Sequence, residues 1–187
     1  MPVLDTRSLG ADMRALRKAR GLTLSALATT LGRSVGWLSQ VERDLSEPSI
    51  SDLRQIAGVL GVPMSLLFAH ASAPAEEQGY VVRAGARRPM GSGDEGLIEE
   101  LLSPDLTDDF EVIHSTFQPH SVMQDPADRP TQEVGYIVSG RLDLTIGNRD
   151  FTVGPGDSFR CRNEPYRWAN PYGEPAVAIW VIAPPVY

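Results

Sequence analysis

The stretch that decides the fold is GLTLSALATTLGRSVGWLSQVERDLSEPSISDLRQIAGVLGVPMSLLF, residues 21–68. After Thr23, which can cap a helix, apolar side chains recur at helical spacing: Leu24, Leu27, Ala28 and Leu31. Gly32 predicts the end of this helix, because only glycine adopts the left-handed conformation there without a steric clash. Ser34 can cap a second helix that runs to about Arg43. The stretch therefore predicts two short helices joined by a tight turn.

A helix, a short turn containing glycine and a second helix form the helix-turn-helix pattern. In the second helix, Leu38 and Val41 are expected to point inward, which leaves its N-terminal end exposed. Such an end suits the major groove of DNA, where glycine permits close approach and small apolar side chains meet thymine methyl groups. A small helical bundle with an exposed patch is the alternative. The residues expected to contact DNA are Arg33, Ser34, Val35, Gly36, Trp37, Gln40 and Arg43.

A family resemblance rests on matches at fixed spacing: Gly21, Leu27-Ala28, Leu31-Gly32, Ser34, Leu38 to Arg43, Pro48-Ser49, Leu60 to Pro63 and Leu67-Phe68. The stretch resembles the DNA-binding domain of phage repressors and of the XRE (xenobiotic-response-element) family of bacterial regulators. Asp44 stands where the family usually has glycine, at a position that often needs a left-handed backbone, which Asp tolerates. The resemblance implies that Arg17 pairs with Glu42; contact of Arg17 with a DNA phosphate is the alternative.

Charge and composition limit the class of protein. The chain of 187 residues has a net charge of −7, yet residues 1–70 hold eight basic and six acidic side chains, so the acidic excess lies in the second half. That half is expected to be repelled by DNA and to suppress non-specific binding. No apolar run approaches 20 residues, no secretion leader is evident, and Cys161 is the single cysteine. We therefore expect a cytoplasmic protein without membrane contact.

The organisation expected from these patterns is an α + β protein of two domains. An all-α, five-helix domain of helix-turn-helix type spans residues 1–70, and residues 71–79 read as a linker of small and acidic residues. From Tyr80 onward, short apolar runs of period two alternate with Gly, Pro, Asn and Asp, which predicts about eight strands in a sandwich or barrel over residues 80–187.

The β-rich half has a resemblance of its own, carried by turn and strand residues: Tyr136 to Leu142, Gly154 to Ser158, Pro165-Tyr166 and Asn170. These resemble the two motifs of the cupin fold over residues 110–184, which implies a jelly-roll barrel. Metal-binding cupins supply His-x-His, a Glu and a later His. Aligned on Glu133, this chain has Ala127, Arg129 and Tyr166 at the histidine positions.

A metal site needs about three ligands, and arginine stays protonated and cannot serve. We therefore expect no metal, no cofactor and no catalytic residue. Two alternatives remain. One is a rebuilt metal site from His114 and Glu133. The other follows from a resemblance in domain architecture to helix-turn-helix proteins fused to an iron cupin, among them an epoxidase of phosphonate biosynthesis.

A small-molecule pocket is the function expected for the barrel. Arg129 offers a planar fork that matches an anionic or polar group, and aromatic side chains supply apolar walls. His114 shares a strand face with Phe110, Val112 and Thr116 and lines the interior if that face points inward. The residues expected in this effector pocket are His114, Arg129, Glu133, Tyr166, Trp168 and Trp180. Two alternatives are an Arg129–Glu133 bridge that only fills the cavity, and a barrel that only dimerises.

The sequence as a whole predicts a transcription regulator. One recognition helix reads only a few base pairs, so a homodimer on a partly palindromic double-stranded operator is expected to supply the missing discrimination. The β-domain is expected to provide the dimer contact and to sense a small-molecule effector.

Overall fold

The computed structural model describes residues 8–68, 74–77, 79–91, 96–104, 106 and 108–186. The chain divides into two compact units, one comprising Met1–Arg88 and Ser103–Asp108, the other Pro89–Leu102 and Asp109–Val186. The expected N-terminal helices and C-terminal β-rich part are both present. Much of the expected linker, residues 71–79, lies outside the described residues, and Ala75–Glu77 form a 3-10 turn.

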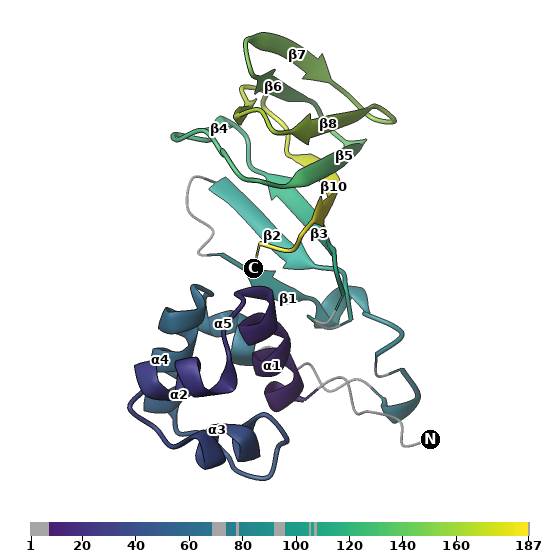
Figure 1. Ribbon diagram of the computed structural model, residues 1–187. Helices are drawn as coiled ribbons and strands as arrows, with labels where there is room; N and C mark the ends of the chain where they lie inside the picture. Colours follow the sequence, from purple (N-terminus) through teal and green to yellow (C-terminus); the bar gives the residue numbers. More distant parts are fainter. Residues whose placement is uncertain are drawn as a thin grey trace. The chain divides into compact units, whose positions relative to one another are not determined.

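The helical unit contains α1 (Leu9–Ala19), α2 (Leu24–Thr30), α3 (Val35–Val41), α4 (Ile50–Leu60) and α5 (Met64–Phe68) (Figure 1). The first four have seven to eleven residues, whereas the expected fifth helix has only five. A side-chain hydroxyl accepts a backbone N–H at the start of each of the four: Ser8, Thr23, Ser34 and Ser49. Such caps contribute about 1 kcal/mol each. The boundaries predicted at Thr23 and Ser34 are confirmed.

The first turn of α1 packs against the end of α3. The Gly10 N–H donates to Asp44 Oδ1 at 2.9 Å, and a Cβ at Gly10 would overlap the carbonyl oxygen of Val41. Asp44 has a φ of 56°, the left-handed conformation predicted at this position. Because Asp tolerates that conformation and also supplies the acceptor, it does more here than glycine would.

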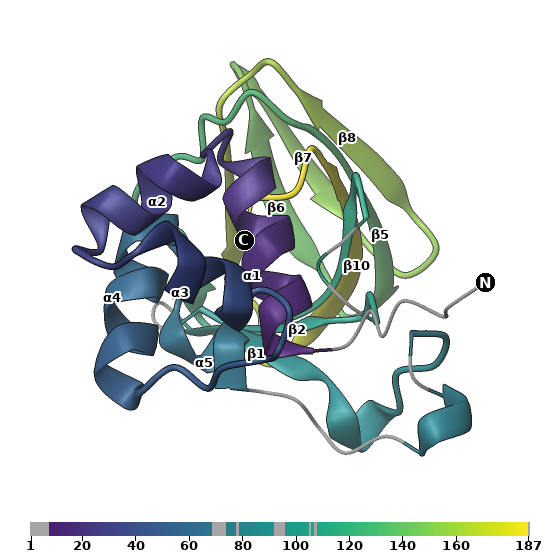
Figure 2. The same cartoon turned by 60° about the horizontal axis from the view of Figure 1, so that its bottom comes forward.

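The β-rich unit consists of two sheets. The six-stranded sheet has the order β1 (Arg88–Met90), β2 (Leu97–Leu101), β3 (Glu111–Phe117), β10 (Ala176–Ala183), β5 (Gln132–Ser139) and β8 (Ser158–Arg162). The four-stranded sheet has the order β4 (Ser121–Val122), β9 (Tyr166–Asn170), β6 (Leu142–Ile146) and β7 (Arg149–Val153). Figure 2 shows β5 between β10 and β8.

The expected closed barrel is wrong for the described strands, because β7 and β8 each end a separate sheet. Period-two patterning predicts which face of a strand is buried, but it does not say which strand edges exchange hydrogen bonds.

The core lies between the inner faces of the two sheets. Phe117 on β3 meets Trp168 on β9 edge to face, with ring centroids 4.8 Å apart. Buried residues alternate along β3, β5, β6, β9 and β10, as the period of two predicts. On β8, Cys161 is buried and its neighbours Arg160 and Arg162 are exposed. Every second side chain of such a strand lies on the inner face and is thereby removed from solvent.

On β3 the inward orientation considered for His114 is wrong. The buried set is Glu111, Ile113, Ser115 and Phe117, whereas His114 lies on the other face, with Nδ1 3.8 Å from Glu100 Oε2. Strand alternation defines two faces, and only packing against the second sheet decides which one is buried.

Candidate functional site

The helix-turn-helix motif presents the N-terminal end of α3. Leu27 of α2 and Leu38 of α3 are fully buried and hold the two helices together. Of the residues predicted to contact DNA, Trp37 is half-buried and the other six are exposed: Arg33, Ser34, Val35, Gly36, Gln40 and Arg43. A Cβ at Gly36 would meet no atom within 4 Å. Gly36 is therefore not needed for packing inside the protein, and its small size leaves room for an incoming surface.

Arg33 is held by two neighbours. Its Nε and Nη2 donate to Asp52 Oδ1 at 3.0 and 2.6 Å, and its guanidinium lies 5.2 Å from the centroid of the Trp37 ring. The hydroxyl of Ser49, together with Arg33, lowers the pKa of Asp52. The Arg33 side chain is still 49% exposed. Arg33 thus fixes the turn before α3 while part of its guanidinium stays accessible.

The predicted ion pair between α1 and the end of α3 is confirmed. Arg17 Nε and Nη2 donate to the two carboxylate oxygens of Glu42 at 2.6 and 2.8 Å, and both side chains are buried. Arg17 Nη1 also donates to the carbonyl oxygen of Leu22 at 2.8 Å. The Glu42 carboxylate raises the pKa of Arg17. This bidentate pair locks the orientation of α3 relative to α1.

Gln40 and Arg43 lie further along α3. Both are exposed, and Arg43 Nε donates to the carbonyl oxygen of Ser39 at 3.0 Å. That bond occupies one of the five guanidinium N–H groups and leaves the end of the side chain available to a phosphate.

In the β-rich unit, Glu133 and Tyr166 form a buried hydrogen-bonded group. Tyr166 Oη donates to Glu133 Oε2 at 2.8 Å, and Thr131 Oγ1 donates to Oε1 at 2.6 Å. The Tyr166 ring stacks on Trp180, with centroids 5.7 Å apart. Burial, together with the charge of Glu133, raises the pKa of Tyr166, so the phenol stays protonated and remains a donor.

The other residues of the expected effector pocket do not all join this group. Trp168 and Trp180 are buried on the inner faces, whereas Arg129 is exposed and His114 lies on the other face of β3. Within the described part of the chain, no ion pair joins Arg129 to Glu133. The structure therefore brings together four of the six residues: Glu133, Tyr166, Trp168 and Trp180.

Two further carboxyl groups on the inner face were missed by sequence reasoning. Glu111 is fully buried, its Oε1 accepts from the N–H of Val186 at 3.1 Å, and burial raises its pKa to about 7. Glu99 accepts from Ser115 Oγ at 3.1 Å, and burial raises its pKa as well. Glu111 was missed because the face of β3 that carries His114, and not the face that carries Glu111, was considered as the one that points inward. No group of three or more His, Cys, Asp or Glu among the described residues is placed to hold a metal ion.

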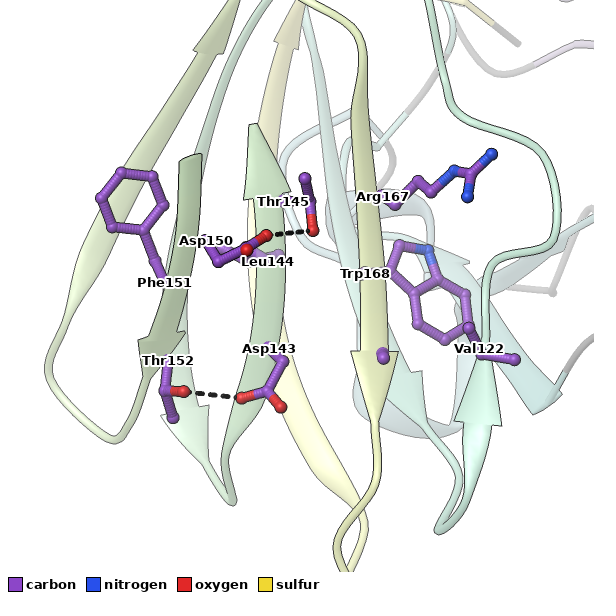
Figure 3. Close-up of a pocket in the computed structure, with 10 residues that line it drawn as sticks. Val122, Asp143, Leu144, Thr145, Asp150, Phe151, Thr152, Arg167 and Trp168 are labelled. Atoms are coloured by element: carbon purple, nitrogen blue, oxygen red, sulfur yellow. Dashed lines mark hydrogen bonds between the residues drawn. The ribbon is translucent and has the colours of Figure 1, made fainter. Parts of the chain in front are cut away.

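One hollow of about 400 Å³ lies over β6, β7 and β9 (Figure 3). Thr145 donates to Asp150 at 2.7 Å and Thr152 donates to Asp143 at 2.7 Å, so each carboxylate is satisfied by the neighbouring strand. These pairs stabilise the hairpin of β6 and β7. Such cross-strand pairs are typical of a solvent-exposed sheet face, so they do not by themselves indicate a ligand site.

Comparison with known proteins identifies both units. A family model for a helix-turn-helix domain matches residues 8–67, and one for a cupin domain matches residues 113–182. The HTH-type transcriptional regulator PuuR of Escherichia coli (strain K12) is 27% identical over 153 residues, which cover 80% of each chain. The chain thus has a helix-turn-helix domain and a cupin domain and is homologous to XRE-type regulators that carry a cupin domain. This XRE-type regulator binds DNA through its helix-turn-helix domain.

A second regulator and a solved structure extend the comparison. The HTH-type transcriptional regulator SutR of Escherichia coli (strain K12) is 27% identical to this XRE-type regulator over 155 residues, 82% of each chain. The structure of KdgF from Halomonas sp. covers 58% of this chain and 96% of its own, with a TM-score of 0.50 and 16% identity, and it shows the fold alone. In the described residues of the XRE-type regulator, no helix is long and apolar enough to cross a membrane.

Proposed function

We propose that this regulator inserts the N-terminal end of α3 into the major groove of a double-stranded operator. The observation that carries the proposal is the exposed end of α3, where Val35 is 45% exposed and Gly36 faces open space, held in place by the buried Arg17–Glu42 pair. A rigid element with a small, apolar tip suits the floor of the groove. In this proposal Gln40, one turn further along, reads a base, and Arg43 contacts a phosphate.

The proposed DNA-binding species is a homodimer in the cytoplasm. One copy of α3 reaches only a few base pairs, and two copies related by a twofold axis read half-sites about one helical turn apart. We assign the dimer contact to the β-rich unit.

The β-rich unit is proposed to bind a small-molecule effector rather than to catalyse a reaction. At the positions where metal-binding cupins have histidine, Ala127 has no donor atom in its side chain and Arg129 stays positively charged. Tyr166 is a protonated donor to Glu133. These residues do not fit a metal ion, which argues against the alternative of an iron enzyme.

Selection of binding sites from random DNA, with the full chain, tests the proposed reading of DNA. We expect enrichment of a partly palindromic site with two half-sites. Gln40→Ala is expected to relax the preference at one base position per half-site and to weaken binding by about 1–3 kcal/mol. The matched control is Arg43→Ala, which is expected to weaken all sequences alike and to reduce the salt dependence.

Enrichment of the same site with unchanged preference by Gln40→Ala would remove Gln40 from the reading residues. Absence of any enriched site by the unaltered protein would overturn the proposed insertion of α3.

A further inference from the structure

A groove of about 720 Å³ is lined by residues of β7 and β8, the strands that end the two sheets of the β-rich unit. Among the described strands, β7 and β8 each have one edge without a neighbour, so backbone N–H and C=O groups border the groove in addition to side chains. None of the residues expected in the effector pocket lines it. The groove is therefore a separate candidate for a ligand.

The groove concentrates positive charge in an acidic part of the chain. After Arg88 the sequence has only six arginines against sixteen Asp and Glu residues, and three of the six line this groove: Arg149, Arg160 and Arg162. An arbitrary surface of this unit would be acidic. The gathering of arginines in one groove points to an anionic ligand.

Of the three arginines that line the groove, only Arg149 pairs with a carboxylate among the described residues. Arg149 Nη2 donates to both carboxylate oxygens of Glu164 at 3.1 Å, and Asp150 accepts from Thr145 at 2.7 Å. In the described part of the chain no carboxylate pairs with Arg160 or Arg162, and both are exposed. They are two residues apart on β8, so they point to the same side of the strand, opposite to Phe159 and Cys161. They line the groove from the outer side of β8, whereas Phe159 lines it from the inner side.

The groove also has an aromatic lining. Phe151 on β7 is 45% exposed, and Phe159 on β8 is half-buried. Phe159 packs edge to face on Trp180, with ring centroids 4.9 Å apart. Its ring occupies the space over Gly135, where any Cβ would overlap it. The position of Phe159 is thus fixed from below, which gives the groove a rigid apolar floor.

We propose that this groove binds a small organic anion with an apolar or aromatic body. Arg160 and Arg162 bind its carboxylate or phosphate, because a guanidinium offers paired donors to such groups, and Phe151 and Phe159 contact the body. This inference rests on the proposed effector function of the β-rich unit. It places the effector at the sheet edges, in the groove between β7 and β8, instead of around Arg129.

Calorimetry on the full chain with phenylacetate, benzoate, hexanoate and phenyl phosphate tests the proposal. We expect at least one of these anions to bind and to change the fluorescence of Trp180 through Phe159. Its neutral or cationic analogue, such as phenylacetamide or benzylamine for phenylacetate, is expected to bind at least tenfold more weakly. The double variant Arg160→Gln, Arg162→Gln is expected to lose at least tenfold in affinity. The matched control Arg167→Gln, which removes an exposed arginine from β9, is expected to bind as the unaltered protein does.

Absence of binding by all four anions, equal binding of the neutral analogue, or full binding by the double variant would overturn the anion site. Operator binding is measured on the same samples and is expected to be unchanged in the ligand-free double variant. An anion that binds without altering operator affinity would support the site and overturn its role as an effector site. The β-rich unit would then be left with dimerisation alone.

Discussion

At the scale of single residues, Arg17 and Glu42 form a bidentate ion pair that is largely shielded from water. Breaking such a pair leaves one charge buried and unpaired, at a cost of about 3–5 kcal/mol, whereas replacing both partners by apolar residues can be neutral. We therefore expect Arg17→Met to unfold at a lower urea concentration than the double variant Arg17→Met, Glu42→Leu. Equal midpoints for the unaltered protein and both variants would mean that the pair contributes nothing to stability.

Glu111 gives a pH-dependent contribution to stability. Burial raises its pKa from 4.5 to about 7, so between these pH values the folded chain holds a proton that the unfolded chain has released. The free energy of unfolding therefore falls as pH rises through this window. Glu111→Gln removes the titration and keeps an acceptor for the Val186 N–H. We expect this variant to be about 1–3 kcal/mol more stable than the unaltered protein at pH 8, with the difference vanishing near pH 4.

Urea denaturation at several pH values measures this difference. The control is Glu174→Gln, which alters an exposed glutamate and is expected to give no comparable pH-dependent gain. A Glu111→Gln difference that is the same at pH 4 and pH 8 would show that Glu111 titrates normally.

At the scale of elements, two glycines on neighbouring helices have opposite roles. Gly10 on α1 lies against the Val41 carbonyl oxygen, so Gly10→Ala is expected to push α1 away from α3 and to cost about 1–3 kcal/mol. Gly36 on α3 faces open space, so Gly36→Ala is expected to raise stability by up to about 1 kcal/mol through helix propensity. The same change is expected to weaken operator binding, because its methyl group enters the interface with DNA.

Thermal unfolding and operator titration of both variants distinguish these roles. Gly36→Ala that binds the operator as tightly as the unaltered protein would show that α3 does not approach DNA closely at this point. Gly10→Ala without loss of stability would show that α1 can shift on α3 at little cost.

At the scale of the whole molecule, the two units divide the chemistry. The helical unit holds the exposed end of α3 that we propose to face DNA, and the β-rich unit is acidic overall, with three of its six arginines in the groove between β7 and β8. At the positions where metal-binding cupins have histidine, the β-rich unit has Ala127, Arg129 and Tyr166. We expect the protein purified without added metal to contain far less than one iron, zinc, manganese or nickel per chain. Chelator is expected to leave its melting temperature unchanged, since a bound structural metal would add to folding stability.

Elemental analysis and thermal unfolding with and without EDTA measure these two quantities. One tightly bound transition metal per chain would contradict the expectation and revive the enzyme alternative.

Local sequence patterns by themselves determined where the helices and strands form. Capping by Thr23 and Ser34 and the stop at Gly32 act within a few residues, so these helix boundaries could be predicted from the chain. Alternation by two likewise predicted the strands. The Arg17–Glu42 pair could be predicted only through a family resemblance, because its partners are 25 residues apart.

Only the tertiary structure decided which faces and edges meet. Glu111 rather than His114 is buried on β3, because the second sheet covers that side of the strand. Arg33 is tied to Asp52, which reaches it from another helix. The gap between β7 and β8 exists because these two edges do not pair, and it gathers arginines from separate strands. Long-range packing settles such choices, since a local pattern offers two faces of equal period and contains no information about which neighbour covers either one.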